Sequence, residues 1–353
     1  MLRIWFNRTY ATHFHTLDLI RANPDRRPVH LIGTHADPDS PVLSTCDESA
    51  PEPDHSLTGA DYVGWALTFC EEHRVDVFVP RWQQGPIAAA RDSFSAAGVA
   101  LVSASAEAIA AVGDKANAYA HAAAAGLPVP PWRVATDAQS FVKAHAELAA
   151  EVGDVCVKPV NGVGGDGFRV LRQQPLKLAD FLTGPTSLQR ADALAAALRE
   201  AESEGRPIPP LLLMPYLPGP EVSVDCLATS DGELLVAVPR TKIGRRRELR
   251  DDPDAVAVAR ALVVRHRLGY LSNTQVRGWA HPGRDESPRA YLLETNPRMS
   301  AGLAQTSLAG VNLPWSAVKL ALGERVDVPE PRLGKAFTTV PAIVVLPDLN
   351  EGH

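Results

Sequence analysis

Three side chains that bind metals and anions stand at alternate positions near the end of one apolar run. Glu294, Asn296 and Arg298 belong to the segment YLLETNPR, residues 291–298. Because side chains alternate between the two faces of a strand, all three would emerge on one face. Carboxylate and amide oxygens suit Mg²⁺, and a guanidinium suits a phosphoryl oxygen that the metal also binds. The spacing indicates nucleotide chemistry, and a solvated strand end with an incidental ion pair is the alternative.

A glycine-rich loop follows a lysine that ends another apolar run. Residues 155–168 read VCVKPVNGVGGDGF, with the lysine at Lys158 and glycines at Gly162, Gly164, Gly165 and Gly167. Glycines let successive backbone N–H groups converge on a phosphate, and a lysine adds a charge for the same oxygens. The spacing is neither a Walker sequence nor a Rossmann fingerprint, because a strand follows the loop. The segment predicts a phosphate site, and a hairpin without a ligand is the alternative.

Two further segments suggest contacts to a nucleotide. Lys115 opens an alanine-rich helix expected over Asp114–Ala125, and a compact ammonium group suits a single phosphate oxygen. The segment LLLMPYLPGPE, residues 211–221, contains a proline that lacks an N–H, which predicts an edge strand or hinge. The free backbone groups of an edge can bind adenine, and Glu221 can accept hydrogen bonds from a ribose. A solvated lysine and a plain interdomain linker are the alternatives.

The first third of the chain alternates short apolar runs with helix-length segments. The expected strands are Leu2–Phe6, Val29–Ile32, Val75–Pro80 and Val99–Val102, and the expected helices include Asp61–His73 and Pro86–Ala97. This alternation predicts a parallel sheet with helices on both faces. Its ligand crevice would lie beyond the carboxyl ends of the strands, where Asn7, Arg8, Arg81 and Trp82 are placed.

The rest of the chain divides at a helix stop in GLPVPP, residues 126–131. A small α+β module follows, with strands at Trp132–Val134, Asp154–Pro159 and Phe168–Leu171 and helices at Ala138–Glu151 and Ala191–Glu204. Longer strands then predict an antiparallel sheet with helices on one face, at Leu211–Tyr216, Glu221–Ala228, Glu233–Pro239, Leu271–Ala280 and Arg289–Thr295, with a helix through Pro253–Leu268. The expected domains are residues 1–112, 113–210 and 211–353.

Composition excludes several classes of protein. The 353 residues are 45% hydrophobic and 22% charged, as in a globular protein of two or three domains. A net charge of −6 without a basic block predicts no nucleic-acid partner. The start lacks a basic region before an apolar one, and no run of about 18 apolar residues follows, so we expect a cytoplasmic protein without a membrane span. Four dispersed cysteines predict free thiols.

Together, Lys115, the Lys158 strand with its glycine loop, the Met214–Glu221 hinge, Gln275 and Glu294-x-Asn296-x-Arg298 resemble the ATP-grasp superfamily. The likeness is to the type of the carbamoyl-phosphate synthetase large subunit and D-alanine–D-alanine ligase, and it covers roughly residues 113–322 in the family's order. It implies an N-terminal Rossmann-like parallel-sheet domain, a small α+β lid and a C-terminal antiparallel-sheet domain. It also implies a homodimer formed through the first domain.

The resemblance implies a role for each matching residue. Lys115 and Lys158 would contact the α- and β-phosphates of ATP, and the loop of residues 162–167 would close over the β- and γ-phosphates. The carbonyl of Met214 or Pro215 and the N–H of Leu217 would bind adenine, and Glu221 the ribose. Gln275, Glu294 and Asn296 would bind Mg²⁺, and Arg298 would steady the acyl-phosphate. Arg240 and Lys242, in the basic segment of residues 240–247, are candidates beside the γ-phosphate, with a solvated basic turn as the alternative.

The activity that the resemblance implies is that of an ADP-forming carboxylate–amine ligase. A carboxylate would attack the γ-phosphate, and an amine would then displace phosphate from the acyl-phosphate. We expect small-molecule carboxylate and amine substrates resembling amino acids. A catalytically silent ATP-binding module and a small-acid kinase that stops at the acyl-phosphate remain as alternatives.

Overall fold

The computed structural model describes residues 1–161, 165–172, 177–178, 187–340 and 343. The chain divides into two compact units. The first unit contains Met1–Val112, Val222–Gln275 and Thr295–His353, and the second contains Gly113–Glu221 and Val276–Glu294. The boundaries fall inside β14 (Tyr270–Trp279) and β15 (Arg289–Asn296), so each of these strands supplies residues to both units.

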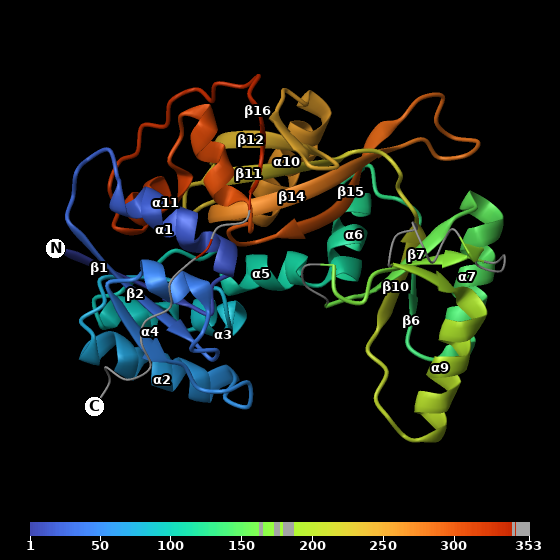
Figure 1. The fold of residues 1–353 in the computed structure, drawn as a ribbon, viewed down its shortest axis with the longest axis horizontal. Helices are drawn as coiled ribbons and strands as arrows, with labels where there is room; N and C mark the ends of the chain where they lie inside the picture. The colour runs from blue at the N-terminus through green and yellow to red at the C-terminus, as the bar shows by residue number, and fades with distance from the viewer. Residues whose placement is uncertain (162–164, 173–176, 179–186, 341–342, 344–353) are drawn as a thin grey trace. The chain divides into compact units, whose positions relative to one another are not determined.

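A parallel sheet of five strands opens the first unit, in the order β3-β2-β1-β4-β5 (Figure 1). The strands are β1 (Leu2–Asn7), β2 (Val29–His35), β3 (Glu48–Pro51), β4 (Val77–Val79) and β5 (Ala100–Leu101). Asn7 lies opposite Thr34, and Phe6 lies opposite Val79. The predicted parallel sheet is therefore confirmed, and β1 and β4 end at the same edge.

Helices cover both faces of this sheet, as predicted. Ile4 and Phe6 enter a core that includes residues of α1 (Phe14–Arg21) and α11 (Leu313–Ala321), whereas Trp5 enters the opposite core. That second core includes residues of α2 (Gly59–Glu72), α3 (Gln84–Ala89) and α4 (Arg91–Ala96). Trp5 stacks on Phe78 with ring centroids 3.8 Å apart. Burying each side chain of this size contributes about 1.5–3 kcal/mol, so the alternation along β1 sets the orientation of the strand.

A second sheet of the chain has the order β15-β14-β11-β12-β13-β16. Its remaining strands are β11 (Glu221–Ala228), β12 (Leu234–Ile243), β13 (Arg246–Leu249) and β16 (Ala336–Thr338). The pairs β12–β13 and β13–β16 are antiparallel. The helix α10 (Pro253–His266) has Pro253 in its first turn and Asp252 as its N-cap, whose carboxylate accepts from the N–H of Ala255 at 3.0 Å.

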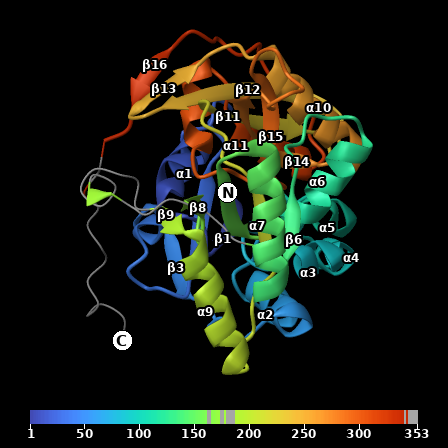
Figure 2. The ribbon, with the colours of Figure 1, turned by 90° about the vertical axis from the view of Figure 1, so that its right-hand side faces the viewer.

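The second unit contains a mixed sheet with the order β6-β10-β7-β8-β9. The strands are β6 (Arg133–Ala135), β10 (Leu211–Pro215), β7 (Val155–Pro159), β8 (Arg169–Arg172) and β9 (Leu188–Arg190). The helices α7 (Ala138–Val152) and α9 (Ala191–Ser203) lie side by side and pack Phe141, Leu148 and Leu198 onto the sheet (Figures 1 and 2). A capping box between Asp137 and Ser140 begins α7.

The remaining short elements complete the described chain. They are η1 (Ala11–His13), η2 (Pro41–Thr45), α5 (Ala106–Gly113), α6 (Lys115–Ala124) and η3 (Leu303–Ala309). The single helix expected over Pro86–Ala97 is wrong, because Ala90 leaves the helical conformation with ψ near 17° and separates α3 from α4. The short strands β3, β9, β13 and β16 were not predicted, because three or four residues carry too little periodicity to be recognised.

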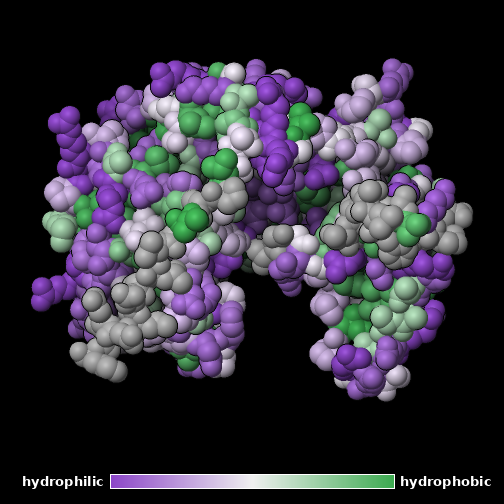
Figure 3. Space-filling model, in the orientation of Figure 1, coloured by the Kyte–Doolittle hydropathy of each residue, from purple (hydrophilic) through white to green (hydrophobic). Residues whose placement is uncertain are grey.

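The described helices include none that is long and apolar enough to cross a lipid bilayer. On the face shown in Figure 3, hydrophobic side chains are scattered among hydrophilic ones. The four cysteines are free, and burial raises the pKa of Cys46, Cys70 and Cys156 to about 12. These thiols are therefore protonated and unreactive near neutral pH.

Candidate active site

Lys158 is a buried cation at the end of β7 in the second unit. Its side chain is only 8% exposed, and its Nζ donates to the carbonyl of Leu293 on β15 at 3.1 Å. Burial lowers the pKa of Lys158 to about 8, and the nearby Glu294 carboxylate opposes this shift. An ammonium group with so little solvation suits an anionic ligand, and the phosphate contact expected for Lys158 stays a prediction.

Lys115 brings a second ammonium group to the same place. Its Nζ lies 4.0 Å from Oε2 of Glu294 and donates to the carbonyl of Val160 at 3.4 Å. The side chain of Asp114 caps α6 by accepting from the N–H of Asn117 at 2.9 Å, which fixes the helix that carries Lys115. The structure therefore brings together two predicted phosphate ligands and one predicted metal ligand, all from the second unit.

Tyr119 is a site residue that the sequence analysis missed. Its side chain is fully buried, and its hydroxyl donates to the carbonyl of Leu293 at 2.9 Å, beside the sulfur of Met214 at 3.4 Å. The Nζ of Lys158 lies 5.9 Å from the centre of the Tyr119 ring. One carbonyl thus accepts from both Tyr119 and Lys158, which anchors the lysine next to Glu294. The only indication of this role in the sequence was that Tyr119 is an aromatic residue about one helical turn after Lys115.

The hinge strand β10 is an edge over only part of its length. It pairs with β7 over Leu211–Pro215 but with β6 over only Leu211–Leu213. Of the predicted edge strand or hinge, the edge is therefore wrong for Leu211–Leu213, because β6 lies beside these three residues. At Met214 and Pro215 the described ladder continues on the β7 side alone. One of these two residues was expected to offer its carbonyl to adenine.

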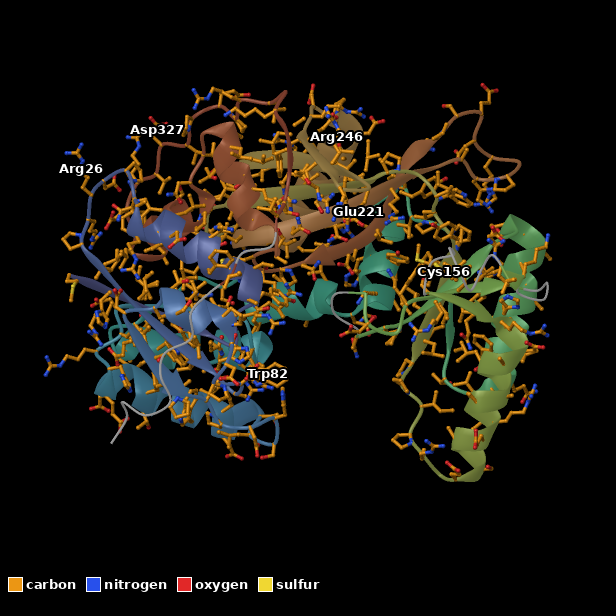
Figure 4. The ribbon with its side chains drawn as sticks, viewed as in Figure 1. Arg26, Trp82, Cys156, Glu221, Arg246 and Asp327 are labelled. Carbon is orange, nitrogen blue, oxygen red and sulfur yellow. The ribbon has the colours of Figure 1, made fainter. Side chains whose placement is uncertain are left out.

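Glu221 has a partner that the sequence did not reveal. Glu221, labelled in Figure 4, is the first residue of β11. Nη2 of Arg277 lies 3.2 Å from Oε2 of Glu221, and Nη1 of Arg277 donates to the carbonyl of Leu217 at 3.2 Å. Arg277 therefore links Leu217, predicted to bind adenine, to Glu221, predicted to bind the ribose. Its Nε is buried and has no hydrogen-bond partner among the described residues. Arg277 stands on β14, far from Glu221 in the sequence, so no local pattern connects the two.

The glycine loop is described only at its end. Gly162 and Gly164 lie outside the described residues, whereas Gly165 and Gly167 have φ angles of 85° and 71°. A Cβ added to Gly167 would lie 2.7 Å from the ring of Pro159. Both positions therefore require glycine, for backbone conformation and, at Gly167, also for space.

The other predicted metal and anion ligands belong to the first unit. Nη2 of Arg298 donates to Oδ1 of Asn296 at 3.4 Å, and Nε2 of Gln275 donates to Oδ1 of Asn273 at 3.4 Å. Glu294, Asn296 and Arg298 are partly exposed, whereas Thr295 and Pro297 between them are buried. The expected alternation of this segment is confirmed. The described residues contain no group of three or more His, Cys, Asp or Glu that could hold a metal, and the predicted set has one carboxylate and two amides.

Arg240 and Lys242 occupy different environments on β12. Arg240 is 8% exposed, with Nε bonded to Oδ2 of Asp225 at 2.7 Å and Nη1 donating to Gln305 at 2.9 Å. Asp225 also accepts from Ser300 at 2.7 Å and from Asn273 at 2.9 Å. Lys242 is exposed near the end of the strand. The structure does not bring these two predicted side chains together, because Arg240 is buried against Asp225 whereas Lys242 is exposed to solvent.

We expect Asp225→Ala to lower the free energy of unfolding by about 3–5 kcal/mol, because it leaves the Arg240 guanidinium buried without a counter-ion. Thermal and urea unfolding measure the change. The matched control is Asp231→Ala, which breaks an exposed ion pair with Arg267 whose side chains are 79% and 69% exposed. That variant is expected to stay within about 0.5 kcal/mol of the parent. Equal losses in the two variants would contradict a buried ion pair at Asp225.

The Lys158 ammonium also predicts a pH dependence for phosphate binding. Since the pKa of Lys158 is lowered to about 8, anion affinity should fall roughly tenfold per pH unit above that value, as the cation loses its proton. Calorimetric titration with Mg·ADP between pH 7 and 9.5 measures this decline in affinity, and Lys158→Arg should bind Mg·ADP without it.

In the absence of ligand, the same lowered pKa makes the stability of the folded protein increase with pH, whereas phosphate affinity decreases. The unfolded chain binds the proton more tightly, so this group makes the free energy of unfolding rise between pH 8 and 10.5.

Solved structures show which fold these units form. A biotin carboxylase in complex with β,γ-ATP from Campylobacter jejuni has a TM-score of 0.65 at 17% identity, covering 95% of this chain and 74% of that chain. A biotin carboxylase domain dimer of the Hydrogenobacter thermophilus 2-oxoglutarate carboxylase, with Mg·ADP and bicarbonate, has a TM-score of 0.66 at 16% identity, covering 95% and 73%. An ADP complex of N5-carboxyaminoimidazole ribonucleotide synthetase has a TM-score of 0.64 at 16% identity, covering 95% and 81%.

The chain has the ATP-grasp fold, and a family match in its C-terminal part agrees with these structures. Residues 207–341 match the family described as ATP-grasp in the biosynthetic pathway with Ter operon. Over 214 residues the chain is 30% identical to the carbamoyl phosphate synthase large chain of Hyperthermus butylicus, which covers 58% of this chain and 18% of that relative. The chain therefore matches less than a fifth of the length of this curated relative.

Proposed function

We propose that this protein is an ATP- and Mg²⁺-dependent ligase that joins a carboxylate to an amine through an acyl-phosphate and releases ADP and phosphate. The observation that carries the proposal is the buried ammonium of Lys158, next to Lys115 and Glu294 in the second unit. Two ammonium groups close to one carboxylate suit a polyphosphate that also carries a metal ion. A structural ion pair would not require the second lysine.

The residues of the second unit fit a nucleotide. Lys115 and Lys158 would hold the phosphates, and the loop that includes Gly165 and Gly167 would donate backbone N–H groups to them. The backbone of Met214, Pro215 and Leu217 would hold the adenine ring. The Arg277 guanidinium holds Glu221 and the Leu217 carbonyl in fixed positions for this purpose. Fixed partners reduce the ordering cost of binding.

Glu294, Asn296 and Gln275 would bind Mg²⁺, whose role when bound is to neutralise charge on the transferring phosphoryl group. One carboxylate and amide oxygens are hard ligands that suit this ion. Glu294 and Asn296 lie two positions apart on β15 and are both partly exposed. Arg298 follows on the same side and would stabilise the negative charge that develops as the acyl group reacts.

Arg240 and Lys242 take separate roles in this proposal. Arg240 would act through its neighbours, because its guanidinium is bonded to Asp225, Gln305 and Ser300. Ser300 and Gln305 come soon after Arg298, so Arg240 is proposed to position the chain that carries Arg298. Lys242 is exposed and would remain available to a γ-phosphate.

A silent ATP-binding module and a small-acid kinase are the competing functions, and one set of assays separates the three. Release of ADP is followed with a panel of amino acids and organic acids, with and without an amine acceptor. Amine-dependent release supports the ligase, release without an amine supports the kinase, and nucleotide binding without turnover supports the module. With an ¹⁸O-labelled carboxylate, one labelled oxygen should appear in the released phosphate, because the carboxylate oxygen that attacks phosphorus leaves with it.

A further inference from the structure

Two guanidinium groups of the first unit lie over one aromatic ring. The Cζ of Arg81 is 3.8 Å from the ring centre of Tyr10, and the Cζ of Arg298 is 5.3 Å from the same centre. Each contact is a favourable cation–π interaction. The two cations nevertheless repel each other at this spacing, since their separation cannot exceed the sum of the two ring distances. The arrangement would gain energy from an anion placed between them.

Arg81 is held in place by its backbone and by one of its own N–H groups. Oδ1 of Asn7 accepts from the N–H of Arg81 at 2.6 Å, and Nη1 of Arg81 donates to the carbonyl of Arg8 at 2.9 Å. Arg8 has a φ of 38° and is fixed by its buried ion pair with Glu52, at 2.7 Å. Because Asn7 and Arg8 at the end of β1 restrain Arg81, and Glu52 after β3 restrains Arg8, the Arg81 guanidinium is preorganised.

The partners of Arg81 differ from those of the other buried arginines of this unit. Arg8 and Arg240 are each paired with a buried carboxylate, Glu52 and Asp225. In the described part of the chain, no carboxylate lies within 4.0 Å of the Arg81 guanidinium, and its Nε is buried without a hydrogen-bond partner. A desolvated cationic donor that lacks an acceptor is unfavourable unless a ligand supplies one.

A small cavity of about 10 Å³ opens beside these groups, with lining that includes His13, Pro80, Arg81, Gln84, Arg298 and Met299. This enclosed volume is about what one water molecule or one oxygen atom requires. His13 adds no charge there at neutral pH, because burial lowers its pKa to about 4. The positive charges of Arg81 and Arg298 also lower the pKa of His13. Its Nε2 bonds to the carbonyl of Ser300 at 2.9 Å. The cavity therefore suits an anionic oxygen.

We propose that Arg81, Tyr10 and Arg298 form a subsite that binds a carboxylate of the small-molecule substrate, with Arg81 as the residue that sets the preference for an acid. The inference rests on the proposed function, and it adds a first-unit residue to the substrate site. A carboxylate has two oxygens that can meet two guanidinium groups at once, whereas a neutral amide offers a single acceptor. The cavity has room for one oxygen of such a group.

The test is calorimetric titration of the full-length protein with succinate, glutarate, L-glutamate and glutaramide at constant ionic strength, with inorganic phosphate as a separate probe. The parent is expected to bind at least one carboxylate and to bind glutaramide at least tenfold more weakly. Arg81→Gln should lower carboxylate affinity by roughly 10- to 100-fold, in keeping with loss of a charge-assisted hydrogen bond. The control Arg260→Gln makes the same charge change at an exposed position of α10 and should bind like the parent.

Substitutions at Tyr10 provide a second test, and they are less disruptive to folding than Arg81→Gln. Tyr10→Phe keeps the ring and should retain carboxylate binding, whereas Tyr10→Leu should lose it. Absence of carboxylate binding in the parent, unchanged binding in Arg81→Gln, or tighter binding of phosphate than of every carboxylate would each overturn the proposal. Mg·ADP titrations keep this result separate from the proposed function, because the nucleotide residues belong to the second unit. Arg81→Gln should bind Mg·ADP as the parent does.

Discussion

Lys158→Met is expected to weaken binding of Mg·ADP and Mg·ATP by roughly 100-fold while leaving the folded protein at least as stable. The loss of a charge-assisted hydrogen bond to phosphate would account for the weaker binding. The stability follows from burial, because Lys158 is 8% exposed and its cation is desolvated on folding. Methionine has a similar length and is apolar, so it occupies the same space without that cost. Isothermal titration calorimetry measures the affinity, and thermal unfolding measures the stability.

The matched control for this variant is Lys143→Met. Lys143 lies on α7 of the same unit and is exposed, so the same chemical change there should alter neither nucleotide affinity nor unfolding by a measurable amount. If Lys158→Met bound nucleotide like the parent, the buried ammonium would be a structural feature and the proposed phosphate site would be wrong. A large loss of stability in Lys158→Met would show instead that the hydrogen bond to Leu293 maintains the fold.

Glu294→Gln is expected to lower turnover by about a thousandfold and to raise the magnesium concentration that turnover requires. The physical reason is that a carboxylate ligand neutralises and positions the metal far better than an amide, and metal charge stabilisation supplies several kcal/mol in phosphoryl transfer. Rates of ADP release at increasing magnesium concentration measure both effects. Gln keeps the shape of the side chain, so β15 and its neighbours Leu293 and Thr295 should be unaffected.

The control for the metal prediction is Glu286→Gln, which removes the same charge from an exposed residue of the second unit. Its magnesium dependence should match that of the parent. A parent-like magnesium curve for Glu294→Gln would remove Glu294 from the metal set. Nucleotide affinity without magnesium gives a further distinction, because a carboxylate near Lys115 and Lys158 that binds no metal should weaken phosphate binding. Glu294→Gln would then bind metal-free ADP more tightly.

Much of the architecture followed from local patterns. The parallel sheet was predicted from apolar runs such as Leu2–Phe6, because burial on both faces leaves a continuous hydrophobic signal. The alternation of Glu294, Asn296 and Arg298 followed from the two-residue period of a strand, and the structure confirms it. Asn7, Arg81 and Trp82 also lie at the carboxyl ends of β1 and β4, as expected, and Oδ1 of Asn7 accepts from both backbone N–H groups. In these cases the determining interaction is repetitive or lies next to a strand end.

The partners of the polar side chains did not follow from such patterns. Arg277 and Glu221 are separated by 56 residues, and the hydroxyl of Tyr119 reaches a carbonyl 174 residues away. The edge at Met214 depends on how far the short strand β6 extends along β10. Periodicity reports which face of an element is buried, and it carries no information about which distant atom that face meets.

Residue types and spacing thus established the kinds of element and the ATP-grasp resemblance, because each depends on short stretches of chain. Tertiary packing decided that Arg240 is bonded to Asp225, and that Arg81 and Arg298 share the ring of Tyr10. It also decided that Lys158 is desolvated enough to shift its pKa. Charge pairing and solvation depend on distance in space, which only the folded arrangement of remote segments sets.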